Sequence, residues 1–496
     1  MKPAQKFAAA LTAATLFYGG QLRQWTDPRN RFLEHWERTD ALSIVVGIVV
    51  LALAFMVARS RIVSGKLERR VVNHLFVAVL GGGLISTFLT YPDYKSETLY
   101  LALTAVIVWS WCHPQLQLPR RLAVGAAIFS PLAAIMAWQL WSYPEWHSPP
   151  EPPKFPQPAR AASPVFVFIC DEWSYTRSTE GGELLPLFKN LRAFAGGATS
   201  FDRALSPGPR TDVSIPRLLW SRTDDLIITP GQTWWPAAAG RTPTRDVPSL
   251  FADARSHGYN TALLGFYLPY RRMLGDQVDS ISSFLEHPKA ATFAAKLNAN
   301  SLRNIAFFHD PFSRKLATRL EQSVLPNSRE AFSRHWEIIN RRLQRDTLGL
   351  IAQSPPNTFS FIHLPLPHCP WVFNPDGTYA GPYRGERMSH DVEGYAKHLA
   401  YLDAVLGQFL DALRRSGKYD DALIAFTSDH SWRLDYTFDG RLQDSEEVRH
   451  VPLLLKLPGQ REPLRIAEKF PLLNLRPVLD AAMRGDAEAT RAALPH

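Results

Sequence analysis

The sequence predicts two parts: an N-terminal α-helical membrane domain of about five spans, and an α/β domain with a mainly parallel central sheet. Four long apolar runs, nearly free of charge, lie within the first 142 residues. After residue 164 the apolar runs become short and alternate with helical stretches. The chain has 496 residues, 46% of them hydrophobic. It is therefore too long for one ordinary domain and too polar to be a membrane bundle alone.

The apolar runs of the first part have the length of membrane helices. At about 1.5 Å per residue, roughly 20 residues cross a hydrocarbon core of about 30 Å. A fifth, weaker run at residues 7–20 follows two lysines and also suits a cleaved signal peptide. The runs behind it favour a retained first span. The four longer runs are residues 41–58, 72–91, 98–112 and 122–142.

Basic residues between the runs predict the orientation, because loops rich in Lys and Arg stay in the cytoplasm. The loop 59–71 carries five Lys or Arg against Glu68, and the segment 113–121 adds two arginines. The alternate loops have balanced charges. Five spans then put the N-terminus inside and everything after residue 142 outside. We expect a multi-pass protein of the inner or plasma membrane with a periplasmic or extracellular second domain.

The net charge of +9 does not indicate nucleic-acid binding. Much of the excess lies in the loops that set the orientation, and no basic stripe with interleaved aromatic residues occurs. Two of the three cysteines, Cys170 and Cys369, fall in the outer part. An oxidising compartment would permit a disulfide between them, but the sequence does not decide whether it forms.

A proline-rich linker is predicted at residues 143–163, since so many prolines suit neither a helix nor a central strand. It joins the transmembrane domain, residues 1–142, to a catalytic domain at 164–480, and residues 481–496 predict a helical tail. Ligands of a parallel sheet bind at the carboxyl ends of its strands. The strand-like runs are "VFVFIC", "TALLGF", "TFSFIHL", "ALIAFTS" and "VPLLLKL".

Carboxylates and imidazoles gather at the ends of these strand-like runs. Asp171 and Glu172 follow "VFVFIC", and Asp429 with His430 follows "ALIAFTS". Such side chains suit a divalent cation such as zinc or manganese. Taken singly, each residue also suits a helix cap, a core histidine or a loop. Their recurrence at several strand ends favours one shared site, and the further histidines are His363, His368 and His450.

These segments resemble, in order and spacing, the alkaline phosphatase and sulfatase superfamily over most of residues 164–460. With apolar spans ahead of them, the arrangement is similar to the membrane-anchored branch of phosphoethanolamine transferases and lipoteichoic acid synthases. The resemblance rests on "VFVFICDEWSY", "LFKNLRAFAGGATSFDRALSPGPRTDVSIPRLLWS", "FIHLPLPHCPW", "AFTSDHSW" and "RHVPLLLKLPG".

The resemblance implies that Thr211 is the nucleophile. Thr211, Ser214 and Pro216 match the Thr-x-x-Ser-x-Pro of the phosphoethanolamine transferases, with Ser214 as a supporting residue that caps or orients. Sulfatases instead require a Cys or Ser that is oxidised to formylglycine. Thr211 therefore argues against sulfate-ester hydrolysis.

The resemblance also assigns the metal and phosphate ligands. Asp429 and His430 match the metal-binding Asp-His, while His363, His368 and His450 match histidines that bind the substrate phosphate or a second metal. The sequence departs from the family where Ser431 replaces a frequent glycine, and where Trp432 and Arg433 replace the Glu-Ser of many transferases.

The expected mechanism uses one or two divalent ions, zinc or manganese. Asp171, or Glu172 if the register slips by one, would join Asp429 and His430 to hold a metal that ligates Thr211. Such a metal lowers the pKa of a bound hydroxyl, so that Thr211 can attack a phosphodiester. Arg210 and Arg217 flank Thr211 and could add positive charge, although both also suit a solvated turn or helix face.

The expected function is a membrane-bound transferase. It would take phosphoethanolamine or phosphoglycerol from a phospholipid onto Thr211 and pass it to an acceptor hydroxyl of an envelope glycan or lipid. A hydrolase with water as the acceptor, either a phosphodiesterase or phosphatase or a sulfatase-like enzyme, would use the same residues. A non-enzymatic scaffold remains a third alternative, and the presence of all the expected ligands counts against it.

Overall fold

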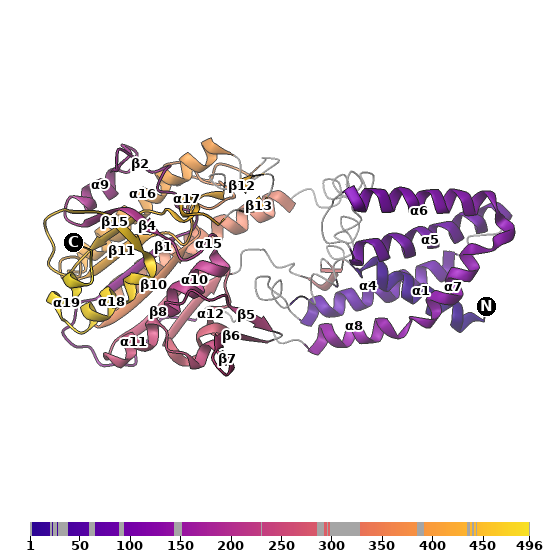
Figure 1. Ribbon diagram of the computed structural model, residues 1–496, viewed down its shortest axis with the longest axis horizontal. Helices are drawn as coiled ribbons and strands as arrows, with labels where there is room; N and C mark the ends of the chain where they lie inside the picture. Colours follow the sequence, from indigo (N-terminus) through magenta and orange to yellow (C-terminus); the bar gives the residue numbers. More distant parts are fainter. Residues whose placement is uncertain are drawn as a thin grey trace. The chain divides into compact units, whose positions relative to one another are not determined.

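The computed structural model describes most of the chain as two units, one helical and one α/β (Figure 1). The described residues before 143, with a few between 292 and 297, form the helical unit, and those from 151 onward form most of the α/β unit. The described ranges are 2–19, 38–58, 65–88, 94–142, 151–229, 231–284, 328–383, 391–433 and 444–495, with a few single residues and short strands between them.

Helices lie over all five predicted apolar runs of the first part. The run 122–142 is not the single helix that the sequence predicts. It breaks at residues 129 and 130, because Pro131 has no N–H with which to continue the helical ladder. The helices are α1 (Pro3–Phe17), α4 (Arg38–Val57), α5 (Lys66–Phe88), α6 (Tyr94–Cys112), η2 (Pro114–Leu116), α7 (Leu118–Ile128) and α8 (Pro131–Ser142).

One helix of the described part of the chain, α4, is by itself long and apolar enough to cross a membrane, with a mean hydropathy of 2.6. The pair Pro114–Ile128 and Pro131–Ser142 meets the criterion only as one span bent by 47°, and the apolar segment Thr98–Cys112 is shorter. Among the described residues there are thus one or two such helices. The predicted number of five spans stays unconfirmed.

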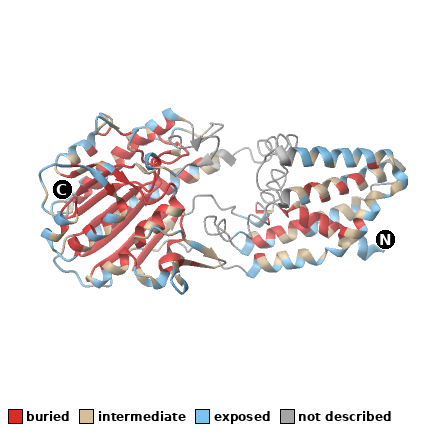
Figure 2. Cartoon of the chain, in the orientation of Figure 1, coloured by how far each residue is buried: buried red, intermediate tan, exposed pale blue. Residues whose placement is uncertain are grey.

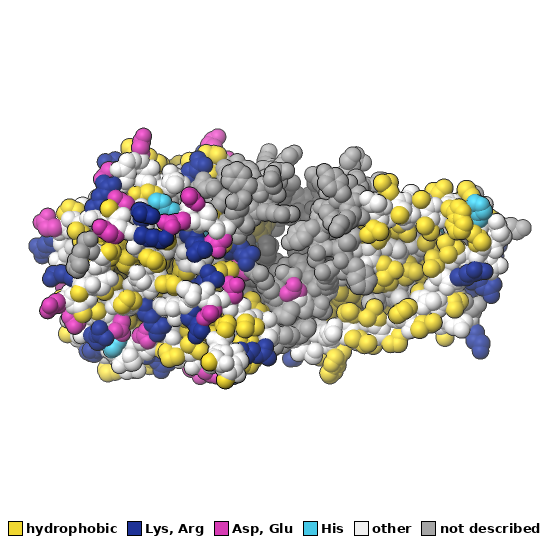
Figure 3. Space-filling view, viewed as in Figure 1, with side chains coloured by type: hydrophobic (Ala, Val, Ile, Leu, Met, Phe, Trp, Pro, Cys, Tyr) yellow, Lys and Arg dark blue, Asp and Glu magenta, His cyan; other side chains and the backbone are white. Residues whose placement is uncertain are grey.

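Large hydrophobic side chains lie exposed on the surface of the helical unit. Most of those that are exposed in the described part of the chain lie between residues 42 and 141, Leu101, Ile128 and Trp138 among them. Figure 3 shows these hydrophobic side chains spread over the visible face of the unit. Soluble monomers rarely expose contiguous apolar patches larger than a few hundred Å². This surface therefore suits an apolar surrounding.

The α/β unit contains the predicted central sheet, which has eight strands. Its order is β15-β4-β14-β11-β1-β10-β8-β9. The sheet is mainly parallel, and β14 runs antiparallel to both of its neighbours. The strands are β1 (Val165–Cys170), β4 (Thr199–Leu205), β8 (Asn260–Phe266), β9 (Ser280–Phe284), β10 (Thr358–Leu364), β11 (Leu423–Thr427), β14 (Leu453–Lys456) and β15 (Leu464–Pro471).

Helices cover both faces of this sheet. Those on one face include α10 (Thr211–Trp220), α11 (Leu250–Ser256), α12 (Tyr270–Leu274) and α18 (Leu475–Met483). Those on the other face include α9 (Lys189–Ala195), α15 (Ser328–Gln353) and α16 (Val392–Arg415). The remaining elements are η3 (Thr244–Asp246), η4 (Gly275–Gln277), α17 (Glu446–Arg449), η7 (Leu472–Asn474), α19 (Ala487–Ala492), β2 (Thr179–Glu180), β3 (Glu183–Leu184), β5 (Ile227–Thr229), β6 (Gln232–Ala237), β7 (Gly240–Pro243), β12 (Thr437–Phe438) and β13 (Arg441–Leu442).

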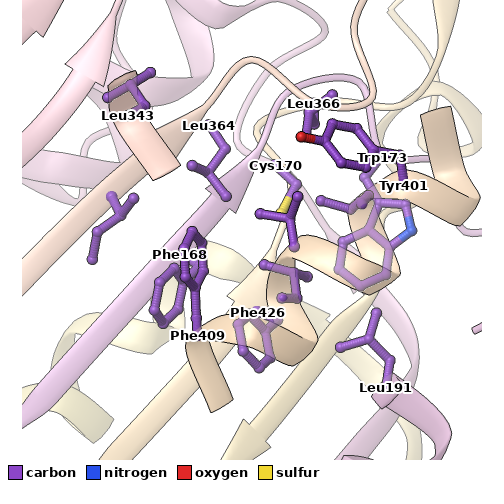
Figure 4. Close-up of a cluster of buried hydrophobic side chains, with 14 of the residues drawn as sticks. Phe168, Cys170, Trp173, Leu191, Leu343, Leu364, Leu366, Tyr401, Phe409 and Phe426 are labelled. Carbon is purple, nitrogen blue, oxygen red and sulfur yellow. The ribbon is translucent and has the colours of Figure 1, made fainter. Parts of the chain in front are cut away.

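The central strand β1 is buried on both faces of the sheet. All six of its residues are buried, and alternate side chains enter the two cores on opposite faces of the sheet. Phe168 packs against Phe409 and Phe426 with ring centroids 5.6 and 4.9 Å apart (Figure 4). Burying one such side chain contributes about 1.5 to 3 kcal/mol. Figure 2 shows the strands buried and the outer sides of the helices exposed.

The segments before and after the sheet differ in part from their predicted roles. Residues 143–150 of the predicted linker lie outside the described residues. Residues 151–163 form no regular element, and the Gln157 N–H and the Arg160 N–H donate to side chains beside β8 and β10, Asn260 and Asn357. This part of the linker therefore packs on the α/β unit. The predicted start of the tail at residue 481 lies inside α18, whose apolar side chains join the core.

A buried histidine makes the stability of the α/β unit depend on pH. His398 in α16 accepts a hydrogen bond from the Phe373 N–H, and burial lowers its pKa from 6.5 to about 3. Between these values the unfolded chain binds a proton that the folded chain does not. Folding stability therefore falls as the pH drops below about 6.5, by up to roughly 1.4 kcal/mol per pH unit from this group.

We expect His398→Gln, whose side-chain carbonyl can accept the same hydrogen bond, to flatten this dependence. Melting temperatures of the wild type and the variant at pH 7 and pH 4.5 measure it. The wild type should lose more between the two pH values, whereas equal losses in both proteins would contradict the prediction.

Candidate functional site

The candidate site lies at the carboxyl ends of two neighbouring parallel strands. β1 ends at Cys170 and β11 at Thr427, and the pairing of Ile169 with Thr427 places both ends at the same edge of the sheet. Polar residues follow both strands directly. The residues are Asp171 and Glu172 after β1, and Ser428, Asp429 and His430 after β11.

Asp171, Asp429 and His430 come together as a buried cluster. One ligand atom from each lies within 4.8 Å of those of the other two. His430 Nε2 is 3.4 Å from Asp171 Oδ1 and 3.6 Å from Asp429 Oδ2. Asp429 Oδ2 accepts no hydrogen bond from any described residue. Because burying two carboxylates side by side is unfavourable without positive charge, the cluster fits a divalent cation.

Short hydrogen bonds hold this cluster in place. The Ser428 hydroxyl donates to the Cys170 carbonyl at 2.5 Å and accepts from the Trp173 N–H at 2.9 Å, which ties the two strand ends together. Asp429 Oδ1 accepts from the His430 N–H at 3.0 Å. His430 Nδ1 donates to the Ser431 carbonyl at 2.8 Å, so that the lone pair of Nε2 faces the carboxylates.

Thr211 lies beside this cluster. It is the first residue of α10, with 5% of its surface exposed, and its Oγ1 is 3.3 Å from His430 Nε2. Since Nε2 has no proton in this tautomer, the threonine hydroxyl donates to it. The N-terminus of a helix also favours an anion. The structure therefore brings together a hydroxyl, the N-terminus of a helix and a set of candidate metal ligands.

Ser214 does not have the predicted capping role. The N-cap residue of α10 is Arg210, which makes no side-chain cap, and the Ser214 N–H already bonds to the Arg210 carbonyl within the helix. The Ser214 side chain is fully buried, and its Oγ has no hydrogen-bond partner among the described residues. No contact in this part of the chain supports an orienting role either.

Glu172 belongs to a second cluster. It has a φ of +65°, a conformation uncommon outside glycine, and its Oε1 is 2.8 Å from Arg433 Nε. Arg433 Nη2 is in turn 2.7 Å from His368 Nε2. Burial raises the pKa of Glu172, and the Arg433 guanidinium opposes this effect. Asp171, and not the alternative Glu172, thus faces Asp429 and His430.

His363 is buried in β10 near the first cluster. Its Nδ1 lies 2.8 Å from the Tyr270 hydroxyl, and burial lowers its pKa to about 4. Burial and the negative charges of Asp429 and Asp171 hold the Tyr270 pKa well above 10, so Tyr270 stays protonated and donates to the neutral imidazole. Tyr270 cannot be recognised from the sequence, because nothing in "LPYRRML" marks this tyrosine as a hydrogen-bond partner of a site residue.

His450, a predicted ligand of the phosphate or a second metal, makes contacts with other residues. Its Nε2 bonds to the Asp202 carbonyl at 2.7 Å, and its ring stacks on Tyr175 with centroids 4.0 Å apart. Burial lowers the pKa of this half-buried imidazole. The contacts described for His450 therefore bring it into neither cluster.

The two arginines that flank Thr211 form ion pairs with nearby aspartates, and the two cysteines of the α/β unit form no disulfide. Arg217 donates to the Pro207 carbonyl at 2.7 Å and pairs with Asp225, so it anchors a loop. Arg210 pairs with Asp212 at 3.2 Å. Cys170 and Cys369 are buried, and the disulfide that the sequence permits between them is not present.

The part of the chain that matches a known protein family covers most of the α/β unit. Residues 164–477 match the sulfatase family. Iduronate 2-sulfatase of Homo sapiens is 35% identical over 85 residues, which are 16% of this chain and 16% of that relative. The chain thus matches only a short part of this curated relative.

Solved structures with a low sequence identity are similar to part of the chain. Ps i-CgsB in complex with k-i-k-neocarrahexaose is 18% identical, with a TM-score of 0.43, over 66% of this chain and 72% of that one. The phosphonate monoester hydrolase of Agrobacterium radiobacter is 17% identical, with a TM-score of 0.42, over 65% and 74%. Likeness at this level says nothing about the substrate.

The first cluster predicts how metal binding responds to mutation. Even an outer-shell change weakens metal binding by about 10- to 100-fold. We therefore expect Asp429→Asn, which removes a direct ligand, to weaken it by more than about 100-fold. Asp411→Asn, an exposed change on α16, is the matched control and should bind like the wild type. Titration of the metal-free protein with zinc or manganese measures both, and equal affinity of Asp429→Asn and the control would exclude this cluster as the metal site.

Proposed function

The chain belongs to the sulfatase family, and from that premise we propose that this sulfatase-like enzyme is a metal-dependent transferase of phospho-headgroups. It takes phosphoethanolamine or phosphoglycerol from a phospholipid and passes it to a hydroxyl of an envelope glycan or lipid. The proposal rests on one observation: the Thr211 hydroxyl lies 3.3 Å from His430 Nε2, beside two buried carboxylates.

The nucleophile position supports phosphoryl rather than sulfate chemistry. Sulfatases use the aldehyde of formylglycine, which forms by oxidation of Cys or Ser. Thr211 is a secondary alcohol, and its oxidation would give a ketone. The intact hydroxyl suits direct attack on phosphorus.

The first half of the cycle forms a phosphothreonine diester. Thr211 Oγ1 bonds to phosphorus, the bond between phosphorus and the diacylglycerol oxygen breaks, and the proton that Thr211 loses is balanced by the proton that diacylglycerol gains. Asp171, Asp429 and His430 would hold zinc or manganese, and such an ion supplies positive charge that lowers the pKa of a nearby hydroxyl. The N-terminus of α10 favours the anionic phosphoryl group.

The second half transfers the group to the acceptor. The acceptor hydroxyl attacks phosphorus, the bond to Thr211 Oγ1 breaks, and Thr211 recovers its proton. If water takes the place of the acceptor, the same residues perform hydrolysis. A non-enzymatic scaffold would not need the buried cluster to be complete.

The helical unit supports a lipid donor. We propose that it holds the protein in the inner or plasma membrane through several spans, with the catalytic unit on the periplasmic or extracellular side. The apolar helix α4 and the exposed hydrophobic side chains between residues 42 and 141 favour this location. A catalytic unit tethered there would have phospholipid headgroups within reach.

Removal of the nucleophile tests the proposal. We expect Thr211→Ala to lower the rate of headgroup transfer by at least about 10⁴-fold, because loss of a nucleophile removes the covalent route. Thr211→Ser should keep part of the activity, and Ser214→Ala should stay within about 10-fold of the wild type. Purified protein with headgroup-labelled phospholipid and a lipid-linked sugar acceptor gives the rates.

Each outcome of this assay has a clear meaning. Full transfer by Thr211→Ala, or loss of transfer in Ser214→Ala alone, would refute the assignment of the nucleophile. Release of free headgroup into water with no labelled acceptor would show a hydrolase instead of a transferase.

A further inference from the structure

The second cluster joins three charged or polar side chains at the same edge of the sheet. Glu172 is buried, with 1% of its side chain exposed, and its Oε1 is 2.8 Å from Arg433 Nε. Arg433 Nη2 is 2.7 Å from His368 Nε2. The side chain of Arg433 is 42% exposed. The Arg433 guanidinium therefore contacts two buried side chains, Glu172 and His368, while part of the Arg433 side chain stays exposed to solvent.

In this cluster Arg433 is the donor and the neutral His368 imidazole accepts its hydrogen bond. His368 Nδ1 donates to the Cys369 carbonyl, so its Nε2 carries a lone pair and accepts from Arg433. Burial and the Arg433 charge keep the pKa of His368 well below 6.5, so the imidazole is neutral. A guanidinium does not lose its proton in proteins. A full positive charge thus stays at this position.

The same position has the ligands of a metal site. Glu172, His368 and Cys369 offer one ligand atom each within 4.8 Å of one another. Arg433 already contacts both of these ligands: its Nε pairs with the Glu172 carboxylate, and its Nη2 donates a hydrogen bond to the His368 lone pair. A cation at this point would have to displace the guanidinium.

The two clusters are directly adjacent. Asp171 and Glu172 are consecutive residues, and the Glu172 N–H lies 3.4 Å from Asp429 Oδ1. The backbone turn at Glu172, with its φ of +65°, sends one carboxylate to each cluster. The fixed charge of Arg433 thus lies next to the first cluster.

We propose that Arg433 takes the place of a second metal ion, so that the enzyme works with one divalent ion and one guanidinium. In this arrangement Arg433, held by Glu172 and His368, binds an oxygen of the phosphoryl group that reacts with Thr211. The role in phosphoryl transfer rests on the proposed function, but the number of metal ions does not.

The charges of the site favour a substrate with a single negative charge. When ionised, Asp171, Glu172 and Asp429 carry three negative charges, which one bound divalent ion and the Arg433 guanidinium would balance. A phosphodiester adds one negative charge, whereas a phosphate monoester adds two. Excess negative charge in a buried site is costly. Arg433 thus selects phosphodiesters over monoesters.

Metal content and turnover of Arg433 variants test the inference. Metal analysis after equilibration with excess zinc or manganese should give one ion per wild-type chain and two per Arg433→Ala chain, because the change frees Glu172 and His368. Arg433→Lys keeps the charge but cannot make both contacts, so it should hold one ion. Arg414→Ala, an exposed change on α16, is the matched control.

Turnover of bis(p-nitrophenyl) phosphate, a diester, and of p-nitrophenyl phosphate, a monoester, completes the test. Arg433→Ala should lose about 100-fold in diester turnover, as for removal of one donor to a reacting oxygen. Added guanidinium should restore part of this turnover and displace the second ion. The ratio of diester to monoester turnover should fall in Arg433→Ala and stay unchanged in Arg414→Ala.

Two results would overturn the inference: two ions in the wild type, or one ion in Arg433→Ala with unchanged diester turnover. Melting temperatures show whether Arg433→Ala is folded, and if it is not, two ions in Arg433→Lys would overturn the inference in its place. If Thr211→Ala still transfers headgroups while Arg433→Ala gains its second ion, the proposed nucleophile fails and the assignment of Arg433 stands.

Discussion

The buried pair of carboxylates, Asp171 and Asp429, is the constraint on which the candidate site depends. Parallel pairing of β1 with β11 brings the two strand ends together, and Ser428, directly after β11, bonds to the Cys170 carbonyl and the Trp173 N–H at the end of β1. Two buried negative charges at this distance need a positive partner. The fold therefore provides a cation site, and His430 completes it with a lone pair that faces the carboxylates.

The neighbouring residues use this site in two different ways. Thr211, at the start of α10, places a hydroxyl against His430, where a bound cation can activate it. Glu172 turns away and holds Arg433, which gives the site a second positive charge that never dissociates. In the proposed reaction, a bound cation and Arg433 would supply one exchangeable and one permanent positive charge, and together these suit a singly charged phosphodiester.

The sequence predicts the sheet and the centre of the site because both follow from local patterns. Short buried apolar runs are typical of parallel strands. The residues directly after neighbouring parallel strands lie at the same edge of the sheet, so the sequence predicts that Asp171, Asp429 and His430 come together there. The roles of other residues depend on tertiary contacts that no local pattern shows. His450 turns to the Asp202 carbonyl, and Tyr270 reaches His363 from another element of the fold.

The most direct test of the account locates the covalent adduct. Purified protein is mixed with phosphatidylethanolamine or phosphatidylglycerol, quenched in acid, digested and analysed by mass spectrometry. We expect a phosphoethanolamine or phosphoglycerol group on Thr211, and this group should be lost when an acceptor is added. Transfer to an acceptor with an adduct on Ser214, or with no adduct on this helix, would contradict it.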